Sequence, residues 1–112
     1  PTSTITTREA LSWVTVEGAR MLKALDRIGT LAPGKQADLV MVRASDLNMQ
    51  PIHDPVTSVI TQTALSNIDT VLIAGQIKKS NGRLLEPDVG TLQNRLQASG
   101  HRIMRDLQAL LH

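Results

Sequence analysis

The chain has 112 residues, of which 41% are hydrophobic, and this composition is typical of one small globular domain and excludes a disordered chain. It has no cysteine, which excludes disulfides and thiolate chemistry, and Trp13 is its only Trp, Tyr or Phe residue, which excludes an aromatic platform for bases or sugars. The net charge is +2 and the longest basic run is Lys78-Lys79, so nucleic-acid binding remains only a third hypothesis, supported by the sequence pI of about 9.5.

The first predicted element is a helix over residues 6–25. Thr6 and Glu9 have the spacing of a capping box, in which each side chain accepts a free backbone N–H at the helix start. Trp13 and Val16 lie off the main apolar face, so we expect the helix to pack against more than one neighbour. Gly18 on the apolar face predicts a close approach of another backbone. That face, at three- and four-residue steps, comprises Leu11, Val14, Gly18, Met21, Leu22 and Leu25.

A connection over residues 29–36 follows the helix. Its segment Ala32-Pro33-Gly34-Lys35 suits a type II turn, because Pro fixes φ at the second position and Gly allows a positive φ at the third. Residues 37–43 then predict a strand, and their four consecutive apolar residues indicate cover on both faces. Residues 44–56 look irregular. Residues 56–65 fit a short helix and a strand equally well.

Residues 69–85 carry the strongest hairpin signal. Thr70–Ala74 and Gln76–Ser80 are rich in strand formers, and Asn81-Gly82 is a favoured turn dipeptide. Lys78 and Lys79 suit an exposed edge of the sheet. The chain therefore has three clear strands, or four if residues 56–65 form one, which is few for a self-sufficient sheet.

The last predicted element is an amphipathic helix over residues 88–111, with Gly100 in its middle. We expect its apolar stripe to pack on another domain or across a subunit interface. The stripe comprises Val89, Leu92, Leu96, Ile103, Leu107, Leu110 and Leu111.

The most specific motif lies in residues 29–42, where Gly29 and Leu31 precede Pro33-Gly34-Lys35, one further residue, Ala37-Asp38 and an apolar strand. This motif resembles the C-terminal signature of the amidohydrolase superfamily of metal-dependent hydrolases. The resemblance covers residues 8 to about 110. Within the superfamily it is similar to the cytosine-deaminase and triazine-hydrolase branch, through His53-Asp54-Pro55, Val71–Ile77 and Asn81-Gly82.

The resemblance implies a two-part enzyme, in which a TIM barrel lies beside a small β-sandwich built from both chain ends. The fold class we expect is thus an α+β fragment. Residues 1–28 would be the last helix of a TIM barrel that the chain otherwise lacks, residues 29–86 the C-terminal strands of the β-sandwich, and residues 87–112 the C-terminal helix. Pro1 is not an initiator Met, so we expect the chain to begin partway through a longer protein; removal of the initiator Met is the alternative.

The resemblance also implies the chemistry. Family members hydrolyse non-peptide C–N bonds with water activated by zinc or another divalent metal, whose ligands are a His-x-His pair, two later histidines and an Asp. This chain has only His53, His101 and His112, and none lies at a matching position. We therefore expect the metal in the upstream barrel, with no catalytic, cofactor-binding or metal-binding residue here, and we do not expect this chain alone to be active.

Three residues have a possible functional role beside a structural one. His53 beside Asp54 could form a base and its orienting carboxylate, but Asp54 also suits the cap of the following segment. Lys35 could bind phosphate, but a phosphate loop has more glycines and leads into a helix. Asp38 could be functional, but a carboxylate at a strand start can accept backbone N–H groups of a turn. We favour the structural interpretation in each case.

The partners we expect are the upstream barrel domain and a second copy of the chain, with neither nucleic acid nor membrane. The sequence has no apolar run near the roughly 18 residues of a membrane helix and no signal pattern, and we expect a cytoplasmic protein. The alternative function is a stand-alone, non-catalytic structural or oligomerisation module.

Overall fold

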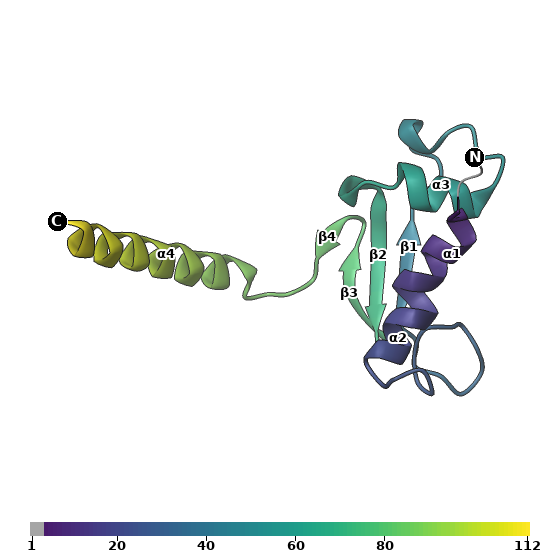
Figure 1. Ribbon diagram of the computed structural model, residues 1–112, viewed down its shortest axis with the longest axis horizontal. Coiled ribbons are helices and arrows are strands. Elements are labelled where there is room, and N and C mark those ends of the chain that lie inside the picture. The colour runs from purple at the N-terminus through teal and green to yellow at the C-terminus, as the bar shows by residue number, and fades with distance from the viewer. Residues whose placement is uncertain (1–3) are drawn as a thin grey trace.

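The computed structural model describes residues 4–112 and has an α+β architecture, as the sequence predicts (Figure 1). An antiparallel sheet has the strand order β1-β2-β3-β4, with β1 at Leu39–Val42, β2 at Ile68–Ile73, β3 at Gln76–Ser80 and β4 at Arg83–Leu84. The α-helices are α1 at Thr7–Ser12, α2 at Gly18–Met21, α3 at Pro55–Gln62 and α4 at Val89–Leu111. A π-helical segment, Trp13–Glu17, joins α1 to α2, and single 3-10 turns lie at Leu47–Met49 and Leu65–Asn67.

The N-terminal helix begins as predicted and ends early. The capping box is formed, since the Thr6 N–H donates to Glu9 Oε2 at 2.7 Å and the Glu9 N–H donates to Thr6 Oγ1 at 3.2 Å. The hydrogen bond from the Thr6 backbone, followed by the one from the Thr6 side chain, lowers the pKa of the Glu9 carboxyl. The predicted end at residue 25 is wrong, because Leu22 is the C-cap and Lys23 takes a φ of 55°, which no helical residue adopts.

Half of the apolar face predicted for this helix is exposed, and the other half is partly buried. Val14 is 72% exposed and Met21 80%, whereas the buried residues of this range, Ala19 at 3% and Ala24 at 6%, lie outside the predicted face. The π-helical segment lies between α1 and α2, and the N–H of Gly18 reaches back to the carbonyl of Trp13. A Cβ on Gly18 would lie 3.3 Å from that same oxygen. The close approach predicted at Gly18 is therefore with its own helix, not with another backbone.

Within residues 4–112, β1 pairs only with β2 and forms one edge of the sheet. Val40 is 61% exposed and Met41 55%. Successive side chains on a strand point to opposite faces, so both faces of β1 are partly open. Residues 4–112 therefore do not supply the full cover that the four apolar residues of this strand predict.

The two hairpins follow the predicted turns. Ala74 and Gly75 have φ values of 51° and 79°, and Asn81 and Gly82 have 49° and 75°, as tight two-residue hairpin turns require. The second turn leads into β4, which is the fourth strand. Because Lys79 pairs with Leu84 of β4, the predicted exposed edge at this lysine is wrong.

The ambiguous segment 56–65 is not a strand, since most of it forms α3. Asp54 caps this helix by accepting the Thr57 N–H at 3.3 Å, and Pro55 occupies its first turn. Thr7 and Thr57 share a hydrogen bond of 3.1 Å, which links α1 to α3. The capping role predicted for Asp54 is confirmed.

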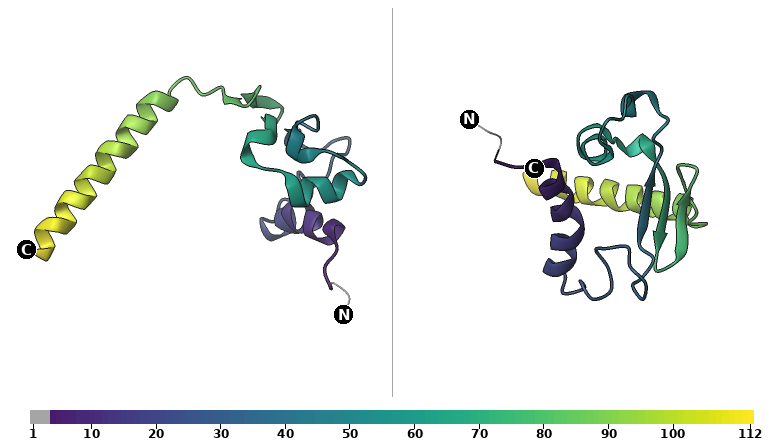
Figure 2. Two further views of the ribbon diagram at one scale, coloured as in Figure 1. Left: turned by 90° about the horizontal axis from the view of Figure 1, so that it is seen from above. Right: turned by 90° about the vertical axis from the view of Figure 1, so that its right-hand side faces the viewer.

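Helix α4 has the predicted extent and stands clear of the rest of the molecule in Figure 1 and in the left view of Figure 2. The radius of gyration is 19.3 Å, whereas a compact domain of this length would have about 13 Å. The apolar core is small: among the described residues the buried hydrophobic ones are Ala19, Ala24 and Met49. No helix formed by residues 4–112 is both long enough and apolar enough to cross a membrane.

Candidate functional site

The motif over residues 29–42 joins the N-terminal helix to the sheet, and Gly29 allows the loop to pack closely on the helix. Gly29 has a φ of 98°, and a Cβ placed on it would lie 2.8 Å from the Cβ of Ala19. Such a separation is shorter than any real contact, so the loop can pack on the helix only because this residue has no side chain. The glycine of the motif is therefore a packing residue.

The Pro-Gly-Lys part of the motif forms the predicted turn. The Lys35 N–H donates to the carbonyl of Ala32 at 3.1 Å, and Gly34 has a φ of 86°. The Lys35 ammonium donates to the carbonyl of Leu25 at 2.7 Å. A backbone carbonyl thus takes one of its donors, which is the structural role that we favoured over phosphate binding.

Asp38 fastens the start of β1 to the first hairpin. Its Oδ1 accepts the Ala74 N–H at 2.7 Å, and next to it the Gly75 N–H donates to the carbonyl of Ala37 at 3.0 Å. The carboxylate accepts a turn N–H, as predicted, but the turn lies 36 residues further along the chain. The motif therefore ties the loop after α2, strand β1 and the β2–β3 hairpin into one unit.

A polar cluster, which we define as Arg43, Asp46, Asn48, Asn67 and Asp69, lies at the other end of β1. Asn67 is its centre and is 2% exposed. Its side-chain amide donates to Asp46 Oδ2 at 2.8 Å and to Asn48 Oδ1 at 2.9 Å, while its Oδ1 accepts from Asn48 at 2.8 Å and from the Ala64 N–H at 2.8 Å. All the hydrogen-bonding capacity of this buried amide is used.

Arg43 supplies the positive charge of the polar cluster. Its guanidinium donates to Asp69 Oδ1 at 2.8 Å and lies 3.5 Å from Asp46 Oδ2. The hydrogen bond from Arg43 lowers the pKa of the Asp69 carboxyl, with help from Thr70, and the same bond raises the pKa of Arg43. The charged and amide groups of the polar cluster bond to one another, which favours a role in holding loops together.

Sequence reasoning missed this cluster. Asp46 and Asn48 lie in the segment 44–56, which the sequence marks only as irregular, and Asn67 and Asp69 carried no signal of a buried cluster. Asn and Asp are common in loops for reasons of local hydrogen bonding, so their types did not distinguish a buried centre from a solvated turn.

The three histidines are apart from one another in the structure. His53 is exposed in the loop before α3, His101 is exposed on α4, and His112 follows α4. Asp54, the neighbour of His53, uses Oδ2 to accept both the N–H and the hydroxyl of Thr57, and the hydroxyl bond is the main cause that lowers the pKa of this carboxyl. The arrangement favours a helix cap over a catalytic pair.

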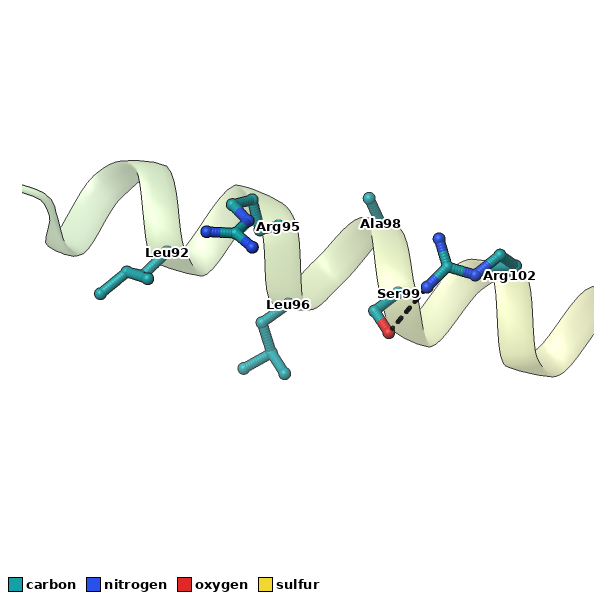
Figure 3. A pocket seen from close by; sticks show the side chains of 6 residues that line it. All are labelled: Leu92, Arg95, Leu96, Ala98, Ser99 and Arg102. Atoms are coloured by element: carbon teal, nitrogen blue, oxygen red, sulfur yellow. Dashed lines mark hydrogen bonds between the residues drawn. The ribbon is translucent and has the colours of Figure 1, made fainter.

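A shallow hollow of about 310 Å³ lies between the loop of residues 48–54 and helix α3. His53, Asp54 and Thr57 are among the residues that line it. No buried side-chain nitrogen or oxygen of residues 4–112 lacks a hydrogen-bond partner, so none is left to bind a ligand there. A second hollow is lined by one face of α4 alone and is open to solvent (Figure 3).

The divalent metal that the resemblance implies needs several donor side chains close together. Within the described part of the chain, no group of three or more His, Cys, Asp or Glu side chains could hold a metal ion. The donor set of residues 4–112 does not fit the metal of the family, and we derive no reaction step through one here.

Comparison with known proteins decides the family. Residues 1–78 match the model of the amidohydrolase family. The chain belongs to this family. Among curated relatives, it is 34% identical over 100 residues to the 8-oxoguanine deaminase of Pseudomonas aeruginosa, with 89% of this chain and 22% of that protein covered. It is 33% identical over 72 residues to the 5-methylthioadenosine/S-adenosylhomocysteine deaminase of Teredinibacter turnerae, with 64% of this chain and 16% of that protein covered.

Solved amidohydrolase structures contain the same fold. A crystal structure of an adenosine deaminase from Xanthomonas campestris with bound zinc matches at a TM-score of 0.83 and 34% identity, covering 89% of this chain and 23% of that one. The atrazine chlorohydrolase of Arthrobacter aurescens, complexed with zinc, matches at a TM-score of 0.74 and 26% identity, covering 83% and 20%. These matches confirm the resemblance to the amidohydrolases, with deaminases and a triazine hydrolase among the relatives. The amidohydrolase chain spans about a fifth of the length of these relatives.

Proposed function

We propose that this chain is the C-terminal part of a metal-dependent amidohydrolase that removes an amino group from a purine-type base or nucleoside. In this proposal residues 1–28 are the last helix of a TIM barrel, residues 29–86 are the C-terminal strands of a β-sandwich, and residues 87–112 are a C-terminal helix. The curated relatives support the substrate class, because those described above are deaminases of purine derivatives. The parent would hold zinc or another divalent metal in barrel strands upstream of Pro1.

The observation that carries the proposal is the exposed apolar surface of the body, by which we mean residues 4–88, the part of the described chain before α4. Val14, Met21 and Leu22 on the N-terminal helix and Val40 and Met41 on β1 are all more than half exposed. Burying apolar surface gives roughly 25 cal/mol per Å², so these side chains would stabilise an interface with a larger domain. An upstream barrel domain is the partner we propose for this surface.

In this arrangement the chain has a supporting role. The motif holds the last barrel helix to the sheet through Gly29, and Asp38 fixes the sheet to its first hairpin. The metal, when bound in the parent, would supply an activated water for attack on the carbon that carries the amino group. The residues described here would keep that barrel closed and attached to the sandwich.

The test uses the polypeptide encoded together with the upstream sequence, loaded with zinc. We expect release of ammonia from adenosine, S-adenosylhomocysteine or 8-oxoguanine, and no release from residues 1–112 alone with added zinc. Asp38→Asn in the whole polypeptide should lower stability more than it lowers kcat, because Asp38 fixes β1 to the hairpin. Asp26→Asn, at an exposed side chain, is the matched control.

Two results would contradict the proposal. Zinc-dependent hydrolysis by residues 1–112 alone would place the active site in this chain. An upstream sequence without a His-x-His pair after a first predicted strand would remove the metal site, and the stand-alone structural module would then be the better account.

A further inference from the structure

Helix α4 has an apolar stripe with a symmetric spacing. The palindromic stripe, as we define it, has successive steps of three, four, seven, four and three residues, and it consists of Val89, Leu92, Leu96, Ile103, Leu107 and Leu110. The steps are the same from either end, and their midpoint falls between Ser99 and Gly100. All but Val89, which is half-buried, are exposed, and none packs in a core.

A symmetric stripe has a specific physical consequence. When two identical helices meet antiparallel about a two-fold axis, each residue on one side of the midpoint faces a residue on the other side of the second copy. About the Ser99–Gly100 midpoint, Leu96 faces Ile103 of the second copy, Leu92 faces Leu107, and Val89 faces Leu110. Every member of the palindromic stripe then has an apolar partner, which a shifted register does not provide for the full set. A parallel pair in register would place each member against its own copy, so the orientation is decided by the charges on the flank of the helix.

The midpoint itself suits a close crossing. Packed helices have axes about 8–10 Å apart, and small residues at the crossing allow the shorter separations. Gly100 has no side chain, and a Cβ placed there would meet nothing within 4 Å. Figure 3 shows that Ser99 is short beside Leu96 and Arg95, and the hollow that these three residues help to line is open to solvent.

The charges beside the palindromic stripe fit the same arrangement. Arg95 and Asp106 lie 11 residues apart, which is close to three full turns, so they share one flank of the helix. In the antiparallel pair this flank faces its own copy, and Arg95 comes within about 3 Å, along the axis, of Asp106 of the second copy. The two-fold repeats this pair. Arg102, further round the helix, donates to Ser99 Oγ at 3.4 Å.

We propose that α4 is a dimerisation helix that binds α4 of a second copy of this chain, antiparallel, about a two-fold axis at Ser99 and Gly100. The occupant is a second copy because the stripe is complementary to its own reverse. A different protein, or a barrel domain of the same polypeptide, would require no such symmetry. The proposal depends only on α4, so a failure of the proposed reaction would not contradict it.

The chain has no cysteine, so single cysteines give site-specific crosslinks without a background. Disulfides form only when the Cα atoms lie within about 7 Å of each other. Under mild oxidation we expect Ser99→Cys to give a covalent dimer. We expect a mixture of Leu92→Cys and Leu107→Cys chains to crosslink at least tenfold more than either variant alone, because these positions face each other only between antiparallel copies.

The matched control is His101→Cys, on the opposite face of α4, which should stay monomeric on a denaturing gel. Crosslinking of Leu92→Cys with itself as efficiently as in the mixture would show a parallel pair and overturn the proposal. So would absence of any crosslink at Ser99→Cys, which is the result expected if α4 packs on the parent barrel instead. The same set in the whole polypeptide should give the same pattern.

Sedimentation gives a second measurement that does not depend on trapping. Gly100→Leu should raise the dimer dissociation constant at least tenfold, because its side chain would separate the helices at the crossing. Leu is a better helix former than Gly, so far-ultraviolet circular dichroism should show no loss of helix. An unchanged dissociation constant, or a wild-type chain that stays monomeric at high concentration, would exclude this interface.

Discussion

The polar cluster and helix α4 hold their structure in opposite ways. Asn67 is almost fully buried and uses every hydrogen bond that its side chain can make, with partners from loops far apart in sequence. Helix α4 has 23 residues, none of them buried, and its hydrogen bonds are local. The body is thus specified by contacts between distant segments, whereas α4 is specified by its own sequence alone.

This difference predicts where the chain is sensitive to change. A buried polar group that loses its partner pays the full cost of desolvation, so the body should respond sharply to single substitutions. A single exposed helix is marginal in water and gains most of its stability from packing, so α4 should respond little until it has a partner. Substitutions in the two regions test this contrast.

The largest effect is expected at Gly29. Gly29→Ala introduces a side chain at a φ of 98°, with its Cβ 2.8 Å from the Cβ of Ala19. A left-handed conformation costs about 1–2 kcal/mol for a residue with a Cβ, and overpacking adds about 1–3 kcal/mol. We expect the free energy of unfolding in urea to fall by about 4 kcal/mol.

The matched control for Gly29→Ala is Gly34→Ala. Gly34 has a similar φ of 86°, but a Cβ there would meet nothing within 4 Å. Only the conformational cost applies, so the expected loss is about 1–2 kcal/mol. Equal losses at the two positions would show that the contact between the motif and the helix does not contribute.

The next effect concerns the polar cluster. Asn67→Ala leaves Asp46, Asn48 and the Ala64 N–H without their partner, and we expect a loss of about 3 kcal/mol in the free energy of unfolding. Asn94→Ala, at an exposed position on α4, should change it by less than about 0.5 kcal/mol. A small loss at Asn67 would mean that water replaces the missing bonds, and the contrast between the two regions would then fail.

The sequence predicts local features well and distant contacts poorly. The Thr6–Glu9 box, the Pro33-Gly34 turn, the two hairpin turns and the extent of α4 depend on residues within a few positions of each other, and each is found. The acceptor role of Asp38 was predicted, but the loop that supplies the N–H was not, because that loop is 36 residues away. The polar cluster was missed for the same reason, because its hydrogen-bond partners also lie far apart in the sequence.

Apolar faces are a different case, since periodicity shows that a face needs cover but not what covers it. The predicted face of the N-terminal helix and the two faces of β1 are partly open in the described residues. The π-helical segment, which no propensity signalled, lies midway along the N-terminal helix. The motif identified the family through Gly29, Pro33, Gly34 and Asp38, whose roles in the structure depend on backbone geometry.

A smaller effect is expected in acid. The Arg43 hydrogen bond lowers the pKa of Asp69 below its unfolded value, so its contribution to stability is present above that value, near pH 4, and is lost as the pH falls through the folded value. Glu9 and Asp54 shift in the same direction. Asp69→Asn should therefore flatten the decline in the urea midpoint below about pH 4, relative to the wild-type chain.

The control for the acid effect is Asp26→Asn, which removes the same charge from a side chain that is 76% exposed. This variant should follow the wild-type curve more closely than Asp69→Asn does. If both variants flatten the decline equally, the acid sensitivity comes from the net charge of the chain and not from the Arg43–Asp69 pair.

The smallest effect is expected on α4, at concentrations low enough for the chain to be monomeric. Leu96 is 75% exposed and Met49 is 2% exposed, although both are large apolar side chains. Leu96→Ala should change the free energy of unfolding by less than about 0.5 kcal/mol, whereas Met49→Ala should cost about 2–5 kcal/mol because it leaves a cavity under α3. When the concentration is raised, Leu96→Ala should begin to cost stability, since Leu96 then faces Ile103 of a second copy. A Leu96→Ala effect that is large in dilute solution would mean that α4 packs within the chain, and one that stays small at every concentration would mean that α4 has no partner of its own kind.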